Sequence, residues 1–252
     1  MTSPKSVPSS RASSDAPSDA SSHASSHASS DASSHASLSL YFHPLASFCW
    51  KVLVALYEND TPFEPHVVDL ADPAQRAELE ALWPLAKFPV LRDDARNRTV
   101  PETSIIIEYL AHHYPGKVPL LPADPDLARE TRQRDRFYDL YVSEPMQKIV
   151  GDRIRPAGSK DPYGVDRARE LLATAYTMID REMATHGGRW AMGDAFTMAD
   201  CSAAPALYYA NLVMPFGDEH AIAAAYLARL VERPSFARTL REAEPYFAMF
   251  PR

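Results

Sequence analysis

Two short stretches in the first half of the chain carry residues suited to holding a peptide. In Lys87-Phe88-Pro89-Val90-Leu91, a proline precedes an apolar run that is typical of a strand. Proline fits a strand only at its beginning or on an edge. A cis bond at this proline would turn the N–H and C=O of the preceding residue outward, free to pair with an extended peptide. Further along, Glu102 and Thr103 open an apolar helical run, a pattern that also suits an ordinary helix start.

The elements that must position these residues follow a simple order in residues 38–113. Alternating apolar residues indicate strands, and apolar residues at helical spacing indicate helices. Asp72 is a good N-cap, with Pro73 at the first helical position. The predicted order is β-α-β-α-β-β-α, with strands at 38–43 and 63–70, helices at 47–58 and 72–83, two strands around 90–101, and a helix at 102–113.

The second half of the chain is predicted to be helical throughout. A Pro-rich connector ends at Pro125, and strand patterns vanish beyond it. Pro145 predicts a kink or break in the first of these helices, and Thr197 with Asp200 forms a capping-box pattern. The expected helices span 126–150, 166–186, 199–211 and 219–232, with a last one beginning at Pro234. Strands and helices in separate blocks predict an α/β module followed by an all-α module.

Composition divides the chain further and narrows the classes of function. Residues 1–37 are almost entirely Ser, Ala, His, Asp and Pro, which predicts a disordered tail. The expected domains are therefore the tail at 1–37, the α/β domain at 38–115, a linker at 116–125 and the helical domain at 126–252. The net charge of −7 disfavours nucleic acid as a partner. No apolar run is long enough for a membrane span, and the tail resembles neither a secretory signal nor a transit peptide.

Cysteines and glycines add two further expectations. The two cysteines lie far apart in sequence, which favours free thiols and a reducing cytoplasm over a disulfide framework. All eight glycines lie after residue 115, so no Gly-rich nucleotide loop serves the strand-rich half. No paired CxxC or HExxH element suggests a metal site. The sequence therefore predicts neither a nucleotide nor a metal cofactor.

Taken together, these features resemble the cytosolic glutathione S-transferase superfamily, of bacterial type, with the class left open. The resemblance covers about residues 38–245 and rests on the element order, the two stretches around Pro89 and Glu102, the Pro-rich linker, and Phe196-Thr197-Met198-Ala199-Asp200. It implies a thioredoxin-like N-terminal domain that binds glutathione. It also implies a helical domain that supplies a pocket for a hydrophobic electrophile, and a homodimeric assembly.

The resemblance also implies roles for five residues at the glutathione site. Pro89 matches the family's cis-proline, and the backbone of Phe88 would pair with the cysteinyl part of the tripeptide. Glu102 would meet the γ-glutamyl ammonium. The N–H and hydroxyl of Thr103 would hold the neighbouring carboxylate at a helix N-terminus, where anions are favoured. Lys87 would approach the glycyl end as a cation, or it is an ordinary surface lysine.

The group that activates the thiol is less clear from the sequence. Many classes of the family carry Ser or Cys where this chain has Ala46. Ser47 follows in the first helical turn and is the candidate donor to the sulfur, unless it only caps the helix. Tyr41, at the end of the first strand, is the rival donor, with a place in the core as its alternative. Cys49 is expected to be a small buried residue, and a mixed disulfide with glutathione is its other interpretation.

The electrophile pocket is expected along the first helix of the helical domain. Phe137, Tyr138, Tyr141 and Met146 are the candidate lining residues, although such a stripe is also typical of a core. Nearby arginines would suit acidic substrates: Arg134, Arg153 and Arg155. The predicted function is conjugation of glutathione to an electrophile. The alternatives are a non-catalytic regulatory protein on the same fold, which Ala46 would suit, and a glutathione-dependent isomerase or dehalogenase.

Overall fold

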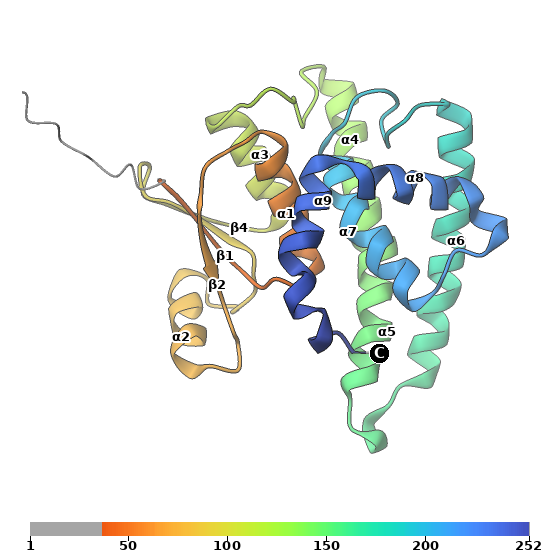
Figure 1. Ribbon diagram of the computed structural model, residues 1–252, viewed down its shortest axis with the longest axis horizontal. Coiled ribbons are helices and arrows are strands. Elements are labelled where there is room, and N and C mark those ends of the chain that lie inside the picture. The colour runs from red at the N-terminus through yellow and green to blue at the C-terminus, as the bar shows by residue number, and fades with distance from the viewer. Residues whose placement is uncertain (1–36, 252) are drawn as a thin grey trace, which may run out of the picture. The chain divides into compact units, whose positions relative to one another are not determined.

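A computed structural model describes residues 37–251, which belong to one compact unit. The first half carries a four-stranded sheet in the order β2-β1-β3-β4 (Figure 1). Strand β1 pairs in parallel with β2 and antiparallel with β3, and β3 pairs antiparallel with β4. The strands are β1 (Leu38–Phe42), β2 (Glu64–Val67), β3 (Val90–Asp93) and β4 (Arg98–Pro101). Strand β2 is shorter than the predicted 63–70.

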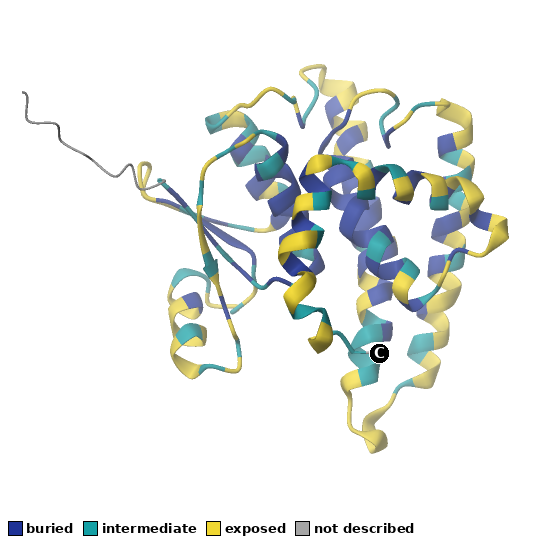
Figure 2. Cartoon of the chain, in the orientation of Figure 1, coloured by how far each residue is buried: buried dark blue, intermediate teal, exposed yellow. Residues whose placement is uncertain are grey.

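Alternation along β1 divides the sheet into two unequal faces. Leu38, Leu40 and Phe42 are buried in the main core, on the side of α1 (Ser47–Glu58) and α3 (Thr103–His113). Tyr41 points to the opposite face, where α2 (Pro73–Leu82) covers a small separate cluster. Figure 2 shows the consequence, because α1 is buried almost throughout while α2 is largely exposed.

Helix α1 lies between the sheet and the helical half. It packs against α3 on one side and against α7 (Met198–Val213) and α9 (Pro234–Ala243) on the other. Trp50 is fully buried at this junction among aromatic rings of the helical half. Residues of both halves thus share one hydrophobic core.

The first helix of the helical half is interrupted just before Pro145, where the sequence predicts a kink or break. Helix α4 (Pro125–Phe137) continues as a π-helical segment, η1 (Tyr138–Ser143), and then as α5 (Glu144–Ile154). Proline has no N–H to give to the preceding turn, so a wider turn at this position loses no hydrogen bond. The remaining helices are α6 (Pro162–His186), α7, α8 (Ala221–Glu232) and α9, joined or followed by short 3₁₀ turns at 157–159, 218–220 and 244–249.

The start of α7 has the capping box that the sequence predicts. The Thr197 N–H donates to Asp200 Oδ2 at 2.8 Å. Asp200 also accepts from the Ala191 N–H at 2.8 Å and the Tyr226 hydroxyl at 2.6 Å. Burial raises the pKa of this carboxyl group. Asp200 therefore holds the start of α7 to the loop before it and to α8.

The predicted fold class is confirmed: a thioredoxin-like α/β half in the order β-α-β-α-β-β-α is followed by an all-helical half. The predicted disordered tail lies outside the described residues, apart from Ser37. The domain boundaries at 115 and 125 stay a prediction. Among residues 37–251, no helix is both long and apolar enough to cross a membrane.

Candidate functional site

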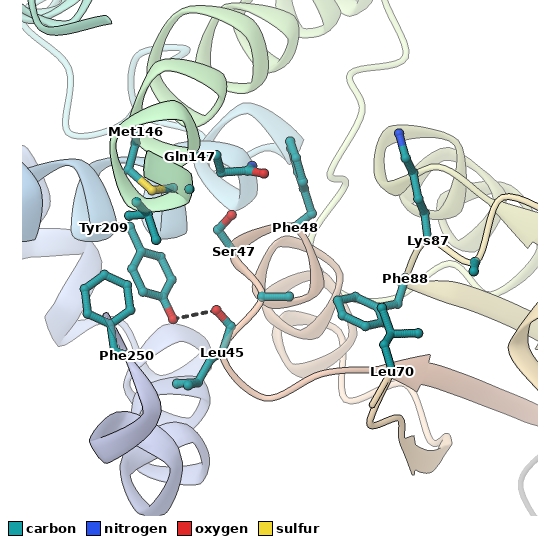
Figure 3. A pocket seen from close by; sticks show the side chains of 14 residues that line it. Leu45, Ser47, Phe48, Leu70, Lys87, Phe88, Met146, Gln147, Tyr209 and Phe250 are labelled. Atoms are coloured by element: carbon teal, nitrogen blue, oxygen red, sulfur yellow. Dashed lines mark hydrogen bonds between the residues drawn. The ribbon is translucent and has the colours of Figure 1, made fainter. Parts of the chain in front are cut away.

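A cavity of about 480 Å³ opens between the start of α1 and the helical half. Figure 3 shows Ser47 at its centre, with Gln147 of α5 on one side and Tyr209 of α7 on another. The Ser47 hydroxyl points toward the side from which Gln147 projects. The complete lining is Leu45, Ala46, Ser47, Phe48, Leu70, Ala86, Lys87, Phe88, Met146, Gln147, Val150, Gly151, Tyr209 and Phe250.

A second cavity, of about 560 Å³, continues from the first toward the start of α3. The two share Phe48, Lys87 and Phe88 as lining residues. Pro89, Glu102 and Thr103 line only the second cavity. The five residues predicted to bind glutathione therefore gather around one hollow, which runs on to Ser47.

The main chain of Phe88 is available to an incoming peptide. The Phe88–Pro89 bond is cis, as the resemblance implies. Within residues 37–251, neither the N–H nor the C=O of Phe88 has a hydrogen-bond partner. Its ring stacks on the imidazole of His43, with 5.8 Å between ring centroids. The side chain is thus held in place while the peptide group stays free.

The N-terminus of α3 opens into the second cavity without a side-chain cap. Three other helices have an aspartate cap: Asp72 on α2, Asp124 on α4 and Asp161 on α6. At α3 the cap position is Glu102, whose side chain makes no capping bond. Its φ of 69° lies in the left-handed region, a conformation that costs about 1–3 kcal/mol in a residue other than glycine. The first-turn N–H groups are thereby free to receive an anion.

The N-terminus of α1 borders the first cavity in the same way. Its cap position is Ala46, which offers no side-chain oxygen. Ser47 is only 8% exposed, yet it lines the cavity. A helix N-terminus and a hydroxyl donor both favour the charged form of a nearby thiol, so this turn suits a thiolate.

Side chains from the first turn of α1 itself and from α7 hold this turn in place. The Trp50 indole N–H donates to the C=O of Pro44 at 2.6 Å. The Tyr209 hydroxyl donates to the C=O of Leu45 at 2.9 Å, the contact dashed in Figure 3. Both donors are buried, so the position of Ser47 depends on packing between the two halves.

The rival candidates for thiol activation lie elsewhere. The Tyr41 ring stacks on His66 at 4.6 Å between centroids, on the α2 side of the sheet, and lines neither cavity. Burial, followed by the neighbouring Glu78, raises the pKa of its hydroxyl. Cys49 is fully buried in the main core. Burial raises the pKa of its thiol, which keeps it in the unreactive neutral form.

A buried ionic cluster lies beneath the second cavity and joins its walls. Lys51 of α1 lies 2.7 Å from Asp135 Oδ1 and 2.8 Å from Asp139 Oδ2. The Ser104 hydroxyl of α3 donates to Asp135 Oδ2 at 2.6 Å, and the Ser202 hydroxyl of α7 donates to Asp139 Oδ1 at 2.8 Å. Burial raises the pKa of Asp135, although the lysine opposes this. Arg136 Nη1 lies 3.9 Å from Asp139 Oδ2 at the exposed edge of the cluster, and Asp135, Arg136 and Asp139 all line the cavity.

The three aromatic residues predicted to line the electrophile pocket do not line either cavity. Phe137 and Tyr138 are each 3% exposed and belong to the main core. Tyr141 is 47% exposed on the outer side of η1. Met146 of the same helical run does reach the first cavity, together with Gln147, Val150 and Gly151 of α5.

Two lining residues come from parts of the chain that the sequence did not indicate. Tyr209 belongs to α7, and Phe250 follows the last turn of the chain and packs on the Tyr209 ring at 5.4 Å between centroids. Both are ordinary apolar positions in their local patterns. No local feature marks them, because only the packing of distant helices brings them to Ser47.

Comparison with known proteins identifies the family. The family model described as "Glutathione S-transferase, N-terminal domain" matches residues 40–118, and that described as "Glutathione S-transferase, C-terminal domain" matches residues 162–234. A "Probable maleylacetoacetate isomerase" of Caenorhabditis elegans is 30% identical over 174 residues, which covers 68% of this chain and 78% of the relative. The chain therefore belongs to the glutathione S-transferase superfamily.

Two further relatives show how wide this superfamily is. A crystallised glutathione S-transferase of Methylobacterium radiotolerans, in complex with glutathione sulfonate, is 28% identical with a TM-score of 0.69, covering 80% of this chain and 93% of that one. A "Stringent starvation protein A homolog" of Pasteurella multocida is 26% identical over 213 residues, covering 82% of this chain and 92% of the relative. Membership of the superfamily leaves the reaction itself to be argued from the site.

Among residues 37–251, no group of three or more His, Cys, Asp or Glu side chains is arranged to hold a metal ion. Both cysteines are free and buried.

Proposed function

We propose that this protein is a glutathione transferase that joins the glutathione sulfur to a hydrophobic electrophile. One observation carries the proposal: a continuous hollow runs from the uncapped start of α3, past the free main chain of Phe88, to the uncapped start of α1 at Ser47. The α3 end of this hollow suits binding of the charged γ-glutamyl end of glutathione, and the α1 end suits activation of its thiol.

In this proposal, glutathione lies along the second cavity. The α-carboxylate of its γ-glutamyl part takes the first-turn N–H groups of α3 and the hydroxyl of Thr103. The neighbouring ammonium meets Glu102, with Asp135 and Asp139 lining the same cavity. The peptide group of Phe88 pairs with the cysteinyl part, which directs the sulfur toward the first cavity.

The chemical step then takes place beside Ser47. The Ser47 hydroxyl and the α1 N-terminus stabilise the thiolate, and the thiol proton passes to solvent. The thiolate attacks an electrophilic carbon held in the first cavity. With an aryl halide, a C–S bond forms, the carbon–halogen bond breaks, and halide leaves with its bonding pair. Ala46 does not prevent this chemistry, because Ser47 supplies the hydroxyl one position later.

The test is retention on immobilised glutathione, followed by an absorbance assay with glutathione and a small nitroaryl chloride. We expect both retention and turnover. Retention without turnover toward any electrophile would favour a regulatory protein, the reading that the stringent starvation protein relatives suggest. Absence of both would reject the proposal.

A glutathione-dependent isomerase is the second candidate, because the relative at 30% identity is a probable maleylacetoacetate isomerase. Isomerisation uses the same bound thiolate, which adds to a double bond and is expelled after rotation. The two reactions separate in one assay, since conjugation consumes glutathione and isomerisation does not.

The family resemblance also supports a cytoplasmic homodimer as a proposal. Apolar side chains are exposed on α4 and η1, namely Leu127 and Tyr141, and Ile105 of α3 is exposed beside the second cavity. Light scattering during gel filtration tests the assembly. A monomer at all concentrations would reject the dimer but would not contradict the proposed reaction.

A further inference from the structure

Helix α5 presents one continuous wall to the first cavity. Met146 and Val150 are four residues apart, as are Gln147 and Gly151, so the four lie together on one side of the helix. Figure 3 shows Gln147 and Met146 projecting from this helix toward the cavity. Any electrophile that reaches the Ser47 turn must lie against this wall.

Neither the packing around Gly151 nor its backbone conformation requires a glycine at this position. Its φ is not positive, and a Cβ built on it would meet no atom within 4 Å. Glycine is less favourable than alanine in the interior of a helix, so its presence here weakens α5 without relieving any clash. What the missing side chain provides is room in the cavity that Gly151 lines.

The polarity of the cavity is as informative as its volume. Apart from Gln147, its helical wall is apolar, and the Tyr209 hydroxyl already donates to the C=O of Leu45. Gln147 is exposed at the cavity and makes no hydrogen bond within the described part of the chain, so its amide is free to bind a ligand. Among the described residues that line this cavity, Lys87 is the only charged one, and it lies at the end shared with the second cavity.

The arginines that would suit an acidic substrate lie outside this cavity. Arg134 pairs with Glu182. Arg153 donates to the C=O of Pro251 at 3.1 Å, and Arg155 lies 4.0 Å from Asp152. A carboxylate on the electrophile would therefore lose water against α5 and gain no cation there, which is unfavourable.

We propose that the α5 wall selects neutral electrophiles with an aromatic or bulky apolar body and one hydrogen-bond acceptor. Gly151 admits the body, and the Gln147 amide donates to the acceptor oxygen. The inference rests on the proposed transferase function and specifies its substrates. With an α,β-unsaturated ketone, the thiolate forms a C–S bond at the β-carbon, the alkene electron pair moves to the carbonyl oxygen, and water protonates the enolate. Gln147 thus acts where negative charge develops.

The experiment compares methyl vinyl ketone, benzylideneacetone and para-carboxy-benzylideneacetone as acceptors of glutathione. For the native protein, we expect kcat/KM for neutral benzylideneacetone to exceed that for the carboxylate about tenfold or more. Gly151→Leu is expected to lower kcat/KM for benzylideneacetone about tenfold and to change that for methyl vinyl ketone less than about twofold. The matched control is Gly158→Leu, which adds the same atoms at an exposed glycine where a Cβ also meets nothing.

Gln147→Met tests the amide at nearly constant volume. We expect about a tenfold loss for benzylideneacetone, while Gln147→Lys narrows the preference against the carboxylate. Gln133→Met, on an exposed position of α4, is the control. An equal effect of Gly151→Leu on large and small ketones, or no preference for the neutral ketone, would overturn the inference. If the native protein conjugates none of the three, the proposed function itself fails.

Discussion

The two walls of the hollow are built by different means. In the proposed function, the wall that faces glutathione is local: it consists of the Phe88 main chain beside Pro89 and of the start of α3, with the side chains of Glu102 and Thr103. The proposed electrophile wall consists of side chains from α5, from α7 and from Phe250 near the chain end. Main-chain groups keep their chemistry while the fold persists, whereas side chains change with single substitutions. The comparison explains how one cofactor can serve many substrates in one family.

Removal of Lys51 should have the largest effect, because its ion pairs join the helices behind both walls. Lys51→Met leaves the buried Asp135 without its cation and Asp139 with only the exposed Arg136 at 3.9 Å, and we expect the free energy of unfolding to fall by about 3–5 kcal/mol. Urea unfolding measures this loss. Lys117→Met, which removes an exposed pair with Asp60, should leave stability nearly unchanged.

The same variant has a defined pH dependence. Burial raises the pKa of Asp135 in the folded protein, so the folded state binds more protons than the unfolded state just above the ordinary carboxyl range. Stability from this group is therefore lost as pH rises through that window. Lys51 lowers the pKa of Asp135, so Lys51→Met should raise this pKa further and extend the pH range of the loss upward. The deficit of Lys51→Met should shrink between pH 7 and about pH 5; a constant deficit would contradict the assigned role of the cluster.

Loss of the α3 opening should weaken glutathione binding but spare the electrophile wall. We expect Glu102→Gln and Thr103→Val each to raise the Kd for glutathione about tenfold, as loss of one charge-assisted hydrogen bond does. Calorimetric titration measures the Kd, with Glu130→Gln on the exposed side of α4 as the control. A change in the KM for the electrophile alone would reverse the assignment of the two walls.

The choice of thiol donor predicts a smaller but specific effect. Ser47→Ala should lower the conjugation rate about tenfold, because it removes a donor from the sulfur. Tyr41→Phe should leave the rate nearly unchanged, since the Tyr41 ring stacks on His66 outside both cavities. Steady-state kinetics at saturating glutathione compares them directly. A larger loss in Tyr41→Phe would assign the role to the strand instead of the turn.

The smallest expected effect belongs to the contact that links α7 to the catalytic turn. Tyr209→Phe removes the hydroxyl that donates to the C=O of Leu45. We expect a loss of about 1 kcal/mol in unfolding free energy and a modest fall in rate with unchanged glutathione affinity. Glutathione affinity that falls along with the rate would mean that the two walls are not separable at this turn.

The same contrast accounts for what sequence alone could predict. Helix starts, a strand-opening proline and a capping box are local patterns, so the fold class could be predicted from the sequence. The glutathione-site residues, which the family resemblance implies, stay a prediction. Of the residues that line the first cavity on its helical side, the sequence indicated Met146 but not Gln147, Tyr209 or Phe250. Phe137 and Tyr138 have the right side chains, but apolar type does not tell which neighbour a helix face meets. The π-helical segment shifts the face only beyond Tyr138, because each extra residue in a turn rotates the following face by about 100°.

Lys51 is another residue whose environment could not be predicted from the sequence alone. In the sequence it is one lysine within an amphipathic helix, where exposure is the normal expectation. Its burial is explained only by Asp135 and Asp139, which lie more than eighty residues further along the chain. Interactions between distant segments leave no local pattern, and they decide both this cluster and the electrophile wall.

The central claim is that the glutathione sulfur arrives beside Ser47, and a substituted thiol tests it most directly. Ser47→Cys, incubated with oxidised glutathione, should exchange disulfides, forming one protein–glutathione disulfide and releasing one reduced glutathione. Intact-protein mass spectrometry detects the adduct. The two native cysteines should not react, because Cys49 and Cys201 are both fully buried. We predict rapid, single modification at position 47 that S-methylglutathione suppresses, and none in Tyr41→Cys. Modification of Tyr41→Cys at an equal or higher rate, or no adduct in Ser47→Cys, would contradict the account.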